Sequence, residues 1–138
     1  MTTRLNPYLT FDGNARDAME FYASVLGGEL NVLAFADMGG MDMPEEKQHL
    51  VMHSDLSVND GVMLMGSDAF DTAAITNGTV SLSGDDGDTL RAWFAGLAEG
   101  GTINVPLEVA PWGDPYGQLT DKFGISWMVN IGGDAPAA

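Results

Sequence analysis

The sequence predicts an α+β fold built from two copies of a β-α-β-β-β module. Two segments, 15–26 and 88–98, have the apolar periodicity of amphipathic helices, and each runs into a pair of glycines. The apolar faces of the two helices coincide after a shift of 72 positions, about half of the 138-residue chain. Each helix lies between two short extended segments, and a predicted hairpin follows. An internal repeat of this length indicates a duplicated supersecondary unit.

In the first module, the helix follows an extended run at residues 8–11 and precedes another at 30–35. Asp12 or Asn14 is placed to cap the first helical turn, and Gly27 and Gly28 are expected to end the helix. The expected buried face of this helix consists of Ala18, Phe21, Tyr22, Val25 and Leu26.

Two strands, at residues 48–58 and 61–66, complete the first module as a hairpin. Residues 59–61 (Asn-Asp-Gly) form the predicted turn, since these residue types tolerate positive φ. Alternate side chains of the longer strand lie on opposite sides of the sheet. The more apolar side, expected under the helix, carries Leu50, Met52, Ser54, Leu56 and Val58. The opposite side carries His49, Val51, His53, Asp55 and Ser57.

The second module repeats this order. The acidic stretch 84–88 precedes the second helix and is expected to cap it, because it lacks the alternating acidic positions and the distal Glu of a calcium-binding EF-hand. The expected buried face of this helix consists of Leu90, Trp93, Phe94, Leu97 and Ala98. Strands are expected at 79–83, 102–107, 116–120 and 125–131, with a hairpin turn at 121–124.

The chain length predicts a single domain spanning residues 1–138. Within it, module one covers about residues 4–70 and module two about residues 75–131. Residues 132–138 have turn composition and are expected to form a frayed tail.

Charge limits the partners of this protein. Five Lys and Arg against 20 Asp and Glu give a formal net charge of −15. A nucleic-acid or anionic-membrane surface requires clustered basic residues, and the basic residues here are spread thinly along the chain. We therefore expect no nucleic acid and no membrane among the partners.

The sequence contains no cysteine, which excludes disulfides, thiolate nucleophiles and cysteine metal sites. The N-terminal residues lack the apolar core of a signal peptide, and the longest aliphatic stretch, 62–65, is far too short for a membrane span. We expect a cytoplasmic protein.

Several motifs resemble the vicinal oxygen chelate superfamily of glyoxalase I, bleomycin-resistance proteins and extradiol dioxygenases. They are similar above all to its PhnB-like branch, also described as 3-demethylubiquinone 3-methyltransferase-like. The resemblance covers residues 4–131 and rests on residues 6–15 (NPYLTFDGNA), 21–35, 53–56 (HSDL), 112–114 (WGD) and 120–130 (TDKFGISWMVN). No glycine-rich loop for S-adenosylmethionine accompanies it, so the sequence does not support methyl transfer.

The resemblance implies the glyoxalase/bleomycin-resistance fold, in which mixed sheets curl around a cavity, and it implies a homodimer. It also implies a divalent metal bound from the first and later strands of each module. This sequence departs from that pattern, because the corresponding strands carry poor ligands for such metals. These residues are Asn6, Tyr8, Thr10, Met63, Met65, Thr79, Ser81, Ser83, Trp127, Val129 and Asn130. We therefore expect no cofactor, with a divalent metal as the alternative.

His53 and Asp55 are the candidate catalytic residues, because they share one side of a predicted strand. They could supply an acid/base pair near neutral pH or two ligands of an atypical metal site. A hydrogen-bonded pair without a catalytic role is the alternative interpretation.

Four aromatic side chains are candidate ligand contacts: Tyr8, Trp112, Tyr116 and Trp127. For Tyr8 and Trp112, the alternative is a purely structural role in packing or in satisfying a carbonyl. The segment 36–48 contains three Met and two Gly, and is either a solvated loop or a lid over a ligand.

These observations favour a metal-independent homodimer that binds an unknown small molecule. The alternatives are a metal-dependent lyase, isomerase or dioxygenase with an atypical ligand set, and a structural dimerisation module. The fold does not decide among them, because one fold supports many chemistries.

Overall fold

The computed structural model describes residues 4–69, 73 and 75–132. The chain divides into two compact units, residues 1–77 and 78–138, and each is described by itself. The predicted frayed tail lies outside the described residues except for Gly132.

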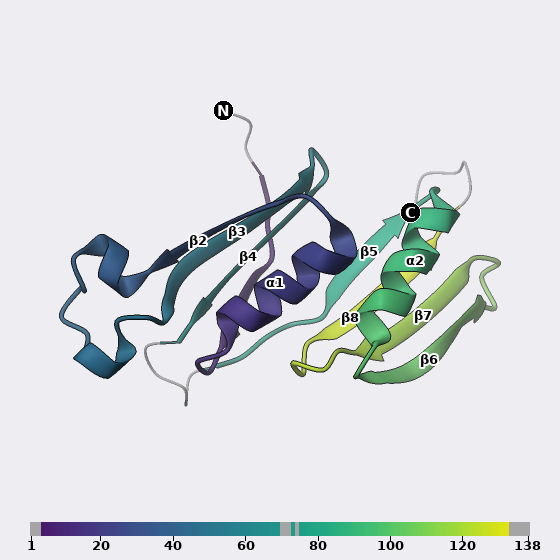
Figure 1. Ribbon diagram of the computed structural model, residues 1–138. Coiled ribbons are helices and arrows are strands. Elements are labelled where there is room, and N and C mark those ends of the chain that lie inside the picture. The colour runs from purple at the N-terminus through teal and green to yellow at the C-terminus, as the bar shows by residue number, and fades with distance from the viewer. Residues whose placement is uncertain (1–3, 70–72, 74, 133–138) are drawn as a thin grey trace. The chain divides into compact units, whose positions relative to one another are not determined.

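Unit 1 is a four-stranded mixed sheet covered on one face by a helix (Figure 1). Its strands lie in the order β1-β4-β3-β2, with β1 parallel to β4 and the other pairs antiparallel. The elements are β1 (Tyr8–Phe11), α1 (Ala15–Leu26), β2 (Glu29–Ala34), the 3-10 turns η1 (Phe35–Met38) and η2 (Glu45–Lys47), β3 (Val51–Asn59) and β4 (Val62–Asp68).

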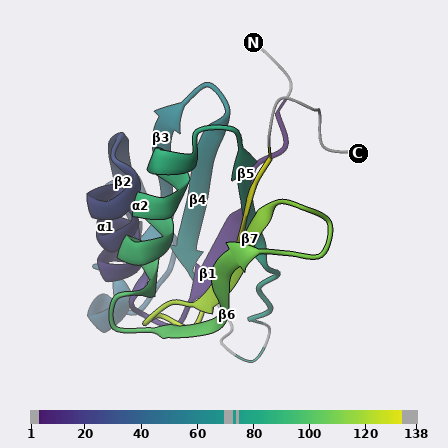
Figure 2. The same ribbon diagram turned by 90° about the vertical axis from the view of Figure 1, so that its right-hand side faces the viewer.

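Unit 2 repeats this topology, with strand order β5-β8-β7-β6, β5 parallel to β8 and the remaining pairs antiparallel. Figure 2 shows α2 lying along one side of its own sheet, as α1 does in unit 1. The elements are β5 (Val80–Gly84), α2 (Gly87–Ala98), β6 (Thr102–Val109), β7 (Pro115–Thr120) and β8 (Ser126–Ile131). The predicted α+β fold of two β-α-β-β-β modules is confirmed.

The helices pack largely through the faces that their periodicity predicted. Ala15 and Met19 are fully buried although the prediction omitted them, and Phe21, Val25, Trp93 and Ala98 are only partly buried. The fully buried helical side chains are Ala15, Ala18, Met19, Tyr22 and Leu26 in α1 and Leu90, Phe94 and Leu97 in α2. Each set packs on the strands of its own unit and forms that unit's core.

Glycines make the two helix exits alike. Gly27 and Gly100 both have φ +78, a left-handed conformation that favours glycine. A Cβ on Gly28 would collide with the Ser57 carbonyl oxygen, and one on Gly101 with that of Thr120. The corresponding exit glycines are therefore 73 positions apart, one more than the helical faces.

A β-bulge corrects the predicted side assignment on β3. The β2–β3 register pairs Leu33 with His53 but Ala34 with Val51, so one residue of β3 is left over between these pairs. Val51 consequently lies in the core, although strict alternation placed it beside His53. His49 precedes the strand and is exposed. Ser54 and Leu56 are buried as predicted.

The predicted hairpins are present, but the first turn does not use the predicted backbone. Residues 59–61 all have negative φ, and the Gly61 N–H donates to the Asn59 side chain over 2.8 Å. A register shift at the end of β3 accommodates this turn. In the second hairpin, Gly124 does have a left-handed φ of +84.

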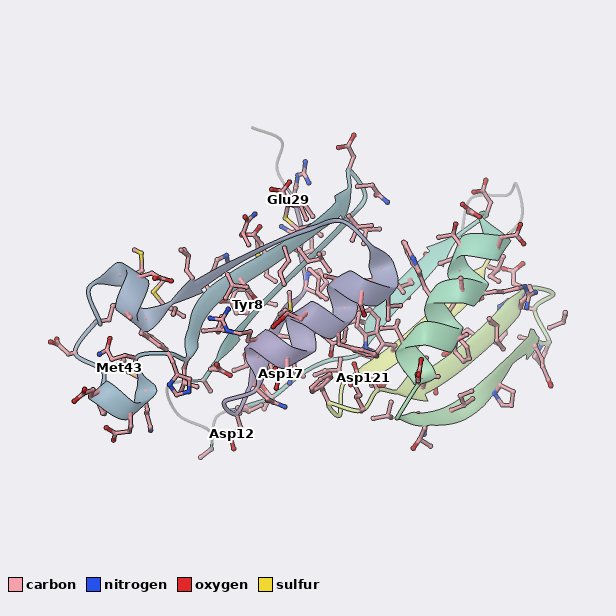
Figure 3. The ribbon with its side chains drawn as sticks, in the orientation of Figure 1. Tyr8, Asp12, Asp17, Glu29, Met43 and Asp121 are labelled. Atoms are coloured by element: carbon pink, nitrogen blue, oxygen red, sulfur yellow. The ribbon has the colours of Figure 1, made fainter. Side chains whose placement is uncertain are left out.

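The Met-rich segment 36–48 is tied together by Gln48. Its side-chain amide donates to the carbonyls of Gly40 and Met43, at 3.2 and 2.6 Å. Figure 3 marks Met43 in this loop, between the two 3-10 turns. Met41 and Asp42 have positive φ values of 47 and 61, an uncommon backbone for non-glycine residues. The lid function of the segment stays a prediction.

Two buried carboxylates organise the connections. Asp68, 4% exposed at the end of β4, accepts the N–H of Ala15 and the N–H of Val51, both at 2.9 Å. It thereby joins the start of α1 to the start of β3, and it replaces the helix cap predicted at Asp12 or Asn14. The Asn14 side chain makes no capping bond.

Asp121, marked in Figure 3 and 3% exposed, is the buried carboxylate that pairs backbone N–H groups in unit 2. One of its oxygens accepts the backbone N–H groups of Phe123 and Ile125, at 2.8 and 3.0 Å. The other accepts the Trp127 indole N–H at 2.9 Å. Asp121 therefore fixes the β7–β8 turn and anchors the largest buried side chain.

Asp68→Asn should destabilise the protein by roughly 1–3 kcal/mol, because the two backbone N–H groups bond different carboxylate oxygens and asparagine keeps only one of these, which leaves one buried donor unpaired. Urea denaturation of the full chain measures the change. Asp12 is an exposed aspartate of the same unit. The substitution Asp12→Asn is the matched control and should leave the unfolding free energy nearly unchanged. Equal stability of the two variants would contradict the assigned role of Asp68.

The acidic stretch before α2 caps that helix, as predicted. Asp86 is the N-cap residue, and it accepts the hydroxyl and the backbone N–H of Thr89, at 2.8 and 3.1 Å. These two hydrogen bonds, the hydroxyl bond first, lower the pKa of Asp86 below its ordinary value of 3.8. The ionised carboxylate therefore contributes stability above pH 3.8, and this contribution is lost as the pH falls through the folded-state pKa.

Asp86→Asn keeps a capping oxygen but removes the titration. The stability advantage of the wild type over this variant should be constant near neutral pH and should shrink as the pH falls below about 4. Urea denaturation of both proteins at a series of pH values measures this difference. The contributions of the other carboxylates are the same in both proteins and cancel. A difference that stays constant down to pH 3 would contradict the pKa shift.

Candidate functional site

Each sheet has one face covered by its helix and one face without a helix. The alternation of side chains puts the core residues on the first face and a mixed polar and aromatic set on the second. In unit 1, the strand register aligns one residue from each strand across the second face: Tyr8, Met65, Asp55 and Asn31. His53 lies on the same side, next along β3 from Asp55. We call this set and its neighbours the unit 1 open face.

Tyr8, His53, Asp55 and Asn31 are linked by polar contacts on the unit 1 open face. The Tyr8 hydroxyl lies 3.1 Å from His53 Nδ1, and the two rings are 5.7 Å apart and inclined by 31°. His53 Nε2 lies 3.5 Å from Asp55 Oδ2, at the long end of hydrogen-bond range. Asn31 Nδ2 donates to Asp55 Oδ1 over 3.3 Å.

Solvent reaches this arrangement. The Tyr8 residue is 46% exposed, and the side chains of His53 and Asp55 are 31% and 30% exposed. Figure 3 marks Tyr8 on β1, at the edge of the unit 1 sheet. A phenol, an imidazole and a carboxylate in contact can bind a polar group or move a proton. The structure thus brings Tyr8, which the sequence identified separately, into contact with the predicted pair of His53 and Asp55.

Unit 2 carries a second polar and aromatic cluster. The Trp112 ring meets Tyr116 edge to face, with centroids 5.2 Å apart, and its Nε1 donates to Asn130 Oδ1 over 3.0 Å. Asn130 in turn donates to Asp114 Oδ2 over 3.1 Å, and Gln118 donates to the Tyr116 hydroxyl. Trp112 is 60% exposed although its orientation is fixed by these contacts. We call this group the Trp112 cluster.

Trp127 lies elsewhere. It is 1% exposed and bonded to Asp121 in the core of unit 2. Residues 127 and 129 of β8 are buried, whereas 128 and 130 are not, so the side of β8 opposite the core carries Met128 and Asn130. Of the candidate ligand contacts Trp112, Tyr116 and Trp127, the structure therefore brings together the first two, and Asn130 contacts Trp112 where Trp127 was expected.

Sequence reasoning missed Asn31, Asp114 and Asn130 as members of these clusters. For two of them, the position on the strand could have indicated membership, because Asn31 pairs with Asp55 and Asn130 pairs with Tyr116 in the strand register. Single-residue register cannot be read from one sequence, because a shift of one residue exchanges the two sides of a strand. Asp114 lies outside the strands and carried no periodic signal.

The divalent metal implied by the family resemblance requires strong ligands on the first and later strands of a module. On the unit 1 open face, β1 and β4 present Tyr8 and Met65, a phenol and a thioether, which are poor donors for such ions. Over the described part of the chain, no group of three His, Asp or Glu side chains is arranged to hold a metal ion. The donor set does not fit the metal, and no chemical step is derived through one.

The fold is similar to that of solved structures from the glyoxalase/bleomycin resistance/dioxygenase superfamily. The bleomycin resistance determinant encoded on transposon Tn5 matches with a TM-score of 0.57 at 18% identity, over 97% of this chain and 100% of that chain. At this identity the likeness concerns the fold alone.

The chain belongs to the family described as 3-demethylubiquinone-9 3-methyltransferase, whose sequence model matches residues 3–130. The Escherichia coli (strain K12) protein YjdN is 32% identical, over 92% of this chain and 94% of its own. Protein PA1353 from Pseudomonas aeruginosa is similar with a TM-score of 0.79 and 35% identity, over 94% of this chain and 97% of that chain. A PhnB protein from Bacillus cereus is similar with a TM-score of 0.72 and 25% identity, over 93% of this chain and 98% of that chain.

No helix in the described ranges is both long and apolar enough to cross a membrane. The cytoplasmic location stays a prediction of the sequence.

Proposed function

We propose that this PhnB-like protein is a metal-independent homodimer that binds a small molecule on its helix-free sheet faces. The observation that carries the proposal is the Trp112 cluster, where an aromatic side chain is exposed yet held in one orientation by Asn130 and Tyr116. Ligand sites combine apolar and aromatic surface with a few polar groups of fixed direction. The unit 1 open face has the same combination, in Tyr8 beside Met65 and His53.

The ligand class follows from the side chains. Met65 and the exposed Leu33 supply apolar contact in unit 1, while Trp112 and Tyr116 offer ring faces in unit 2. A net charge of −15 disfavours anionic ligands at long range. We therefore propose a neutral or cationic ligand with an aromatic or apolar body. Methyl transfer, the activity in the family's description, is not part of the proposal.

Binding is tested with a neutral apolar fluorescent probe, 1-N-phenylnaphthylamine, added to protein dialysed against a chelator. Saturable binding is expected, followed by displacement by members of a metabolite and antibiotic panel. Trp112→Ala should weaken binding about tenfold, the effect of losing roughly 1.4 kcal/mol of contact. Leu5→Ala, which removes a fully exposed apolar side chain elsewhere, is the matched control and should bind as the wild type does.

Two results would overturn this part of the proposal. The first is the lack of saturable probe binding in the wild type. The second is one tightly held ion per chain after dialysis against Fe²⁺, Mn²⁺, Ni²⁺ and Zn²⁺ and removal of the excess. That second result would favour the metal-dependent alternative and would make His53 and Asp55 the first residues to replace.

The homodimer is supported by the apolar edge of unit 2. β6 ends the unit 2 sheet, and its side chains Ile103, Val105 and Val109 are exposed. Exposed apolar edge strands favour pairing with another chain.

Sedimentation velocity at micromolar concentration should therefore give a dimer for the wild type. Val105→Lys should shift the equilibrium toward the monomer, because a charge at this edge opposes pairing. Glu108→Lys, a change on the same strand that removes no apolar side chain, is the control for the added charge. A wild-type monomer would contradict the proposed homodimer and also the purely structural dimerisation alternative.

A further inference from the structure

His53 has a partner at each ring nitrogen. The Tyr8 hydroxyl lies 3.1 Å from Nδ1, and the Asp55 carboxylate lies 3.5 Å from Nε2. Asp55 is itself oriented by the amide of Asn31 on the neighbouring strand. Four side chains from three strands thus form one continuous row of polar contacts. The row ends at the hydroxyl of Tyr8, which is an exposed residue.

For a neutral His53, the partners decide which ring nitrogen carries the proton. An ionised carboxylate only accepts hydrogen bonds, so the Nε2 that faces Asp55 carries the proton of a neutral imidazole. Nδ1 is then an acceptor, and the Tyr8 hydroxyl donates to it. In this arrangement the phenol proton points at a base, while the remaining lone pairs of the phenol oxygen are directed away from His53.

We propose that Tyr8, His53 and Asp55 form a proton relay that makes the Tyr8 oxygen a base at neutral pH. This deepens the proposed function, and rests on it, because the relay acts on a ligand held against the unit 1 open face. As Tyr8 takes a proton from the ligand, its own hydroxyl proton passes to His53 Nδ1. The electron pair of the broken ligand bond stays on the ligand, and the imidazolium formed lies beside the Asp55 carboxylate.

The substrate class follows from this step. It is a small molecule with a weakly acidic proton, either a hydroxyl or a C–H group next to a carbonyl, attached to an apolar body that contacts Met65. Tyr8 is the catalytic residue, since its oxygen touches the reacting proton. His53 accepts the relayed proton, and Asp55 and Asn31 are positioning residues that act through His53.

The relay can be tested without the natural ligand, by the reactivity of the Tyr8 oxygen toward N-acetylimidazole. The oxygen forms an ester bond to the acetyl carbon, the bond from that carbon to the reagent's imidazole breaks, and the Tyr8 proton passes through His53 to the departing ring. Peptide mass spectrometry of the full-length protein measures the acetylation rates of Tyr8 and Tyr116 separately in the same molecule.

The decisive variant is His53→Gln, because glutamine can accept the Tyr8 hydrogen bond but cannot take up its proton. The acetylation rate of Tyr8 should fall by roughly 10²-fold, the lower end of what a positioned proton acceptor supplies. Asp55→Asn should lower the rate less, because it removes the charge beside the imidazolium and keeps the shape. Tyr116, outside the relay, should react equally in all three proteins and is the internal reference for the reagent.

The pH profile separates the relay from a merely structural contact. The wild-type rate at Tyr8 should depend on pH through His53, because the imidazole must be free to take up the Tyr8 proton. In His53→Gln this dependence should be lost, because glutamine cannot take up a proton.

An unchanged Tyr8 rate in His53→Gln, or the same pH dependence of the rate in both proteins, would overturn the relay. Neither result would touch the binding of the neutral probe, which is measured independently. Conversely, the Tyr8 acetylation could be fast and dependent on His53 while the wild type shows no saturable probe binding. That result would retain the relay and overturn the ligand-binding proposal.

Discussion

The carboxylates of Asp68 and Asp121 satisfy buried N–H groups at the junctions on which each unit depends. Asp68 joins the first residue of α1 to the first residue of β3, and Asp121 joins the β7–β8 turn to the indole of Trp127. Buried backbone donors must be paired, because leaving one unpaired costs as much as several ordinary surface contacts contribute. The buried carboxylate pairs N–H groups at a helix start in unit 1 and at a hairpin turn in unit 2, although the strand order of the two units is the same.

Once each helix is fixed on one face of its sheet, the other face remains available for function. The alternation of a strand then decides which side chains that face displays. Ser54 and Leu56 turn inward, and the intervening Asp55 turns outward beside His53. The same constraint therefore generates the core and the candidate site, and a register slip on β3 would exchange them.

Local patterns predicted the helices and hairpins well, because periodicity and glycine placement act within a few residues. The helix α1 has the predicted bounds, and α2 begins one residue earlier than expected. Predictions failed where another segment of the chain intervened. Asp68 caps α1 in place of the nearby Asp12 or Asn14, and the bulge on β3 moves Val51 into the core. Trp127 shows the same limit: its aromatic character was visible, but its hydrogen bond to Asp121 was not.

By itself, the sequence determined the fold class, the duplication and the exclusion of cysteine chemistry, and it identified His53 and Asp55 as a candidate pair. These follow from composition and from spacing along a single strand or helix. Only the tertiary structure decided that Tyr8 meets His53, that Asn130 holds Trp112, and that Trp127 is buried. The physical reason is that Tyr8 and His53 are 45 positions apart and lie on strands separated by β4. Their contact is set by the register of three strands, which no local pattern encodes.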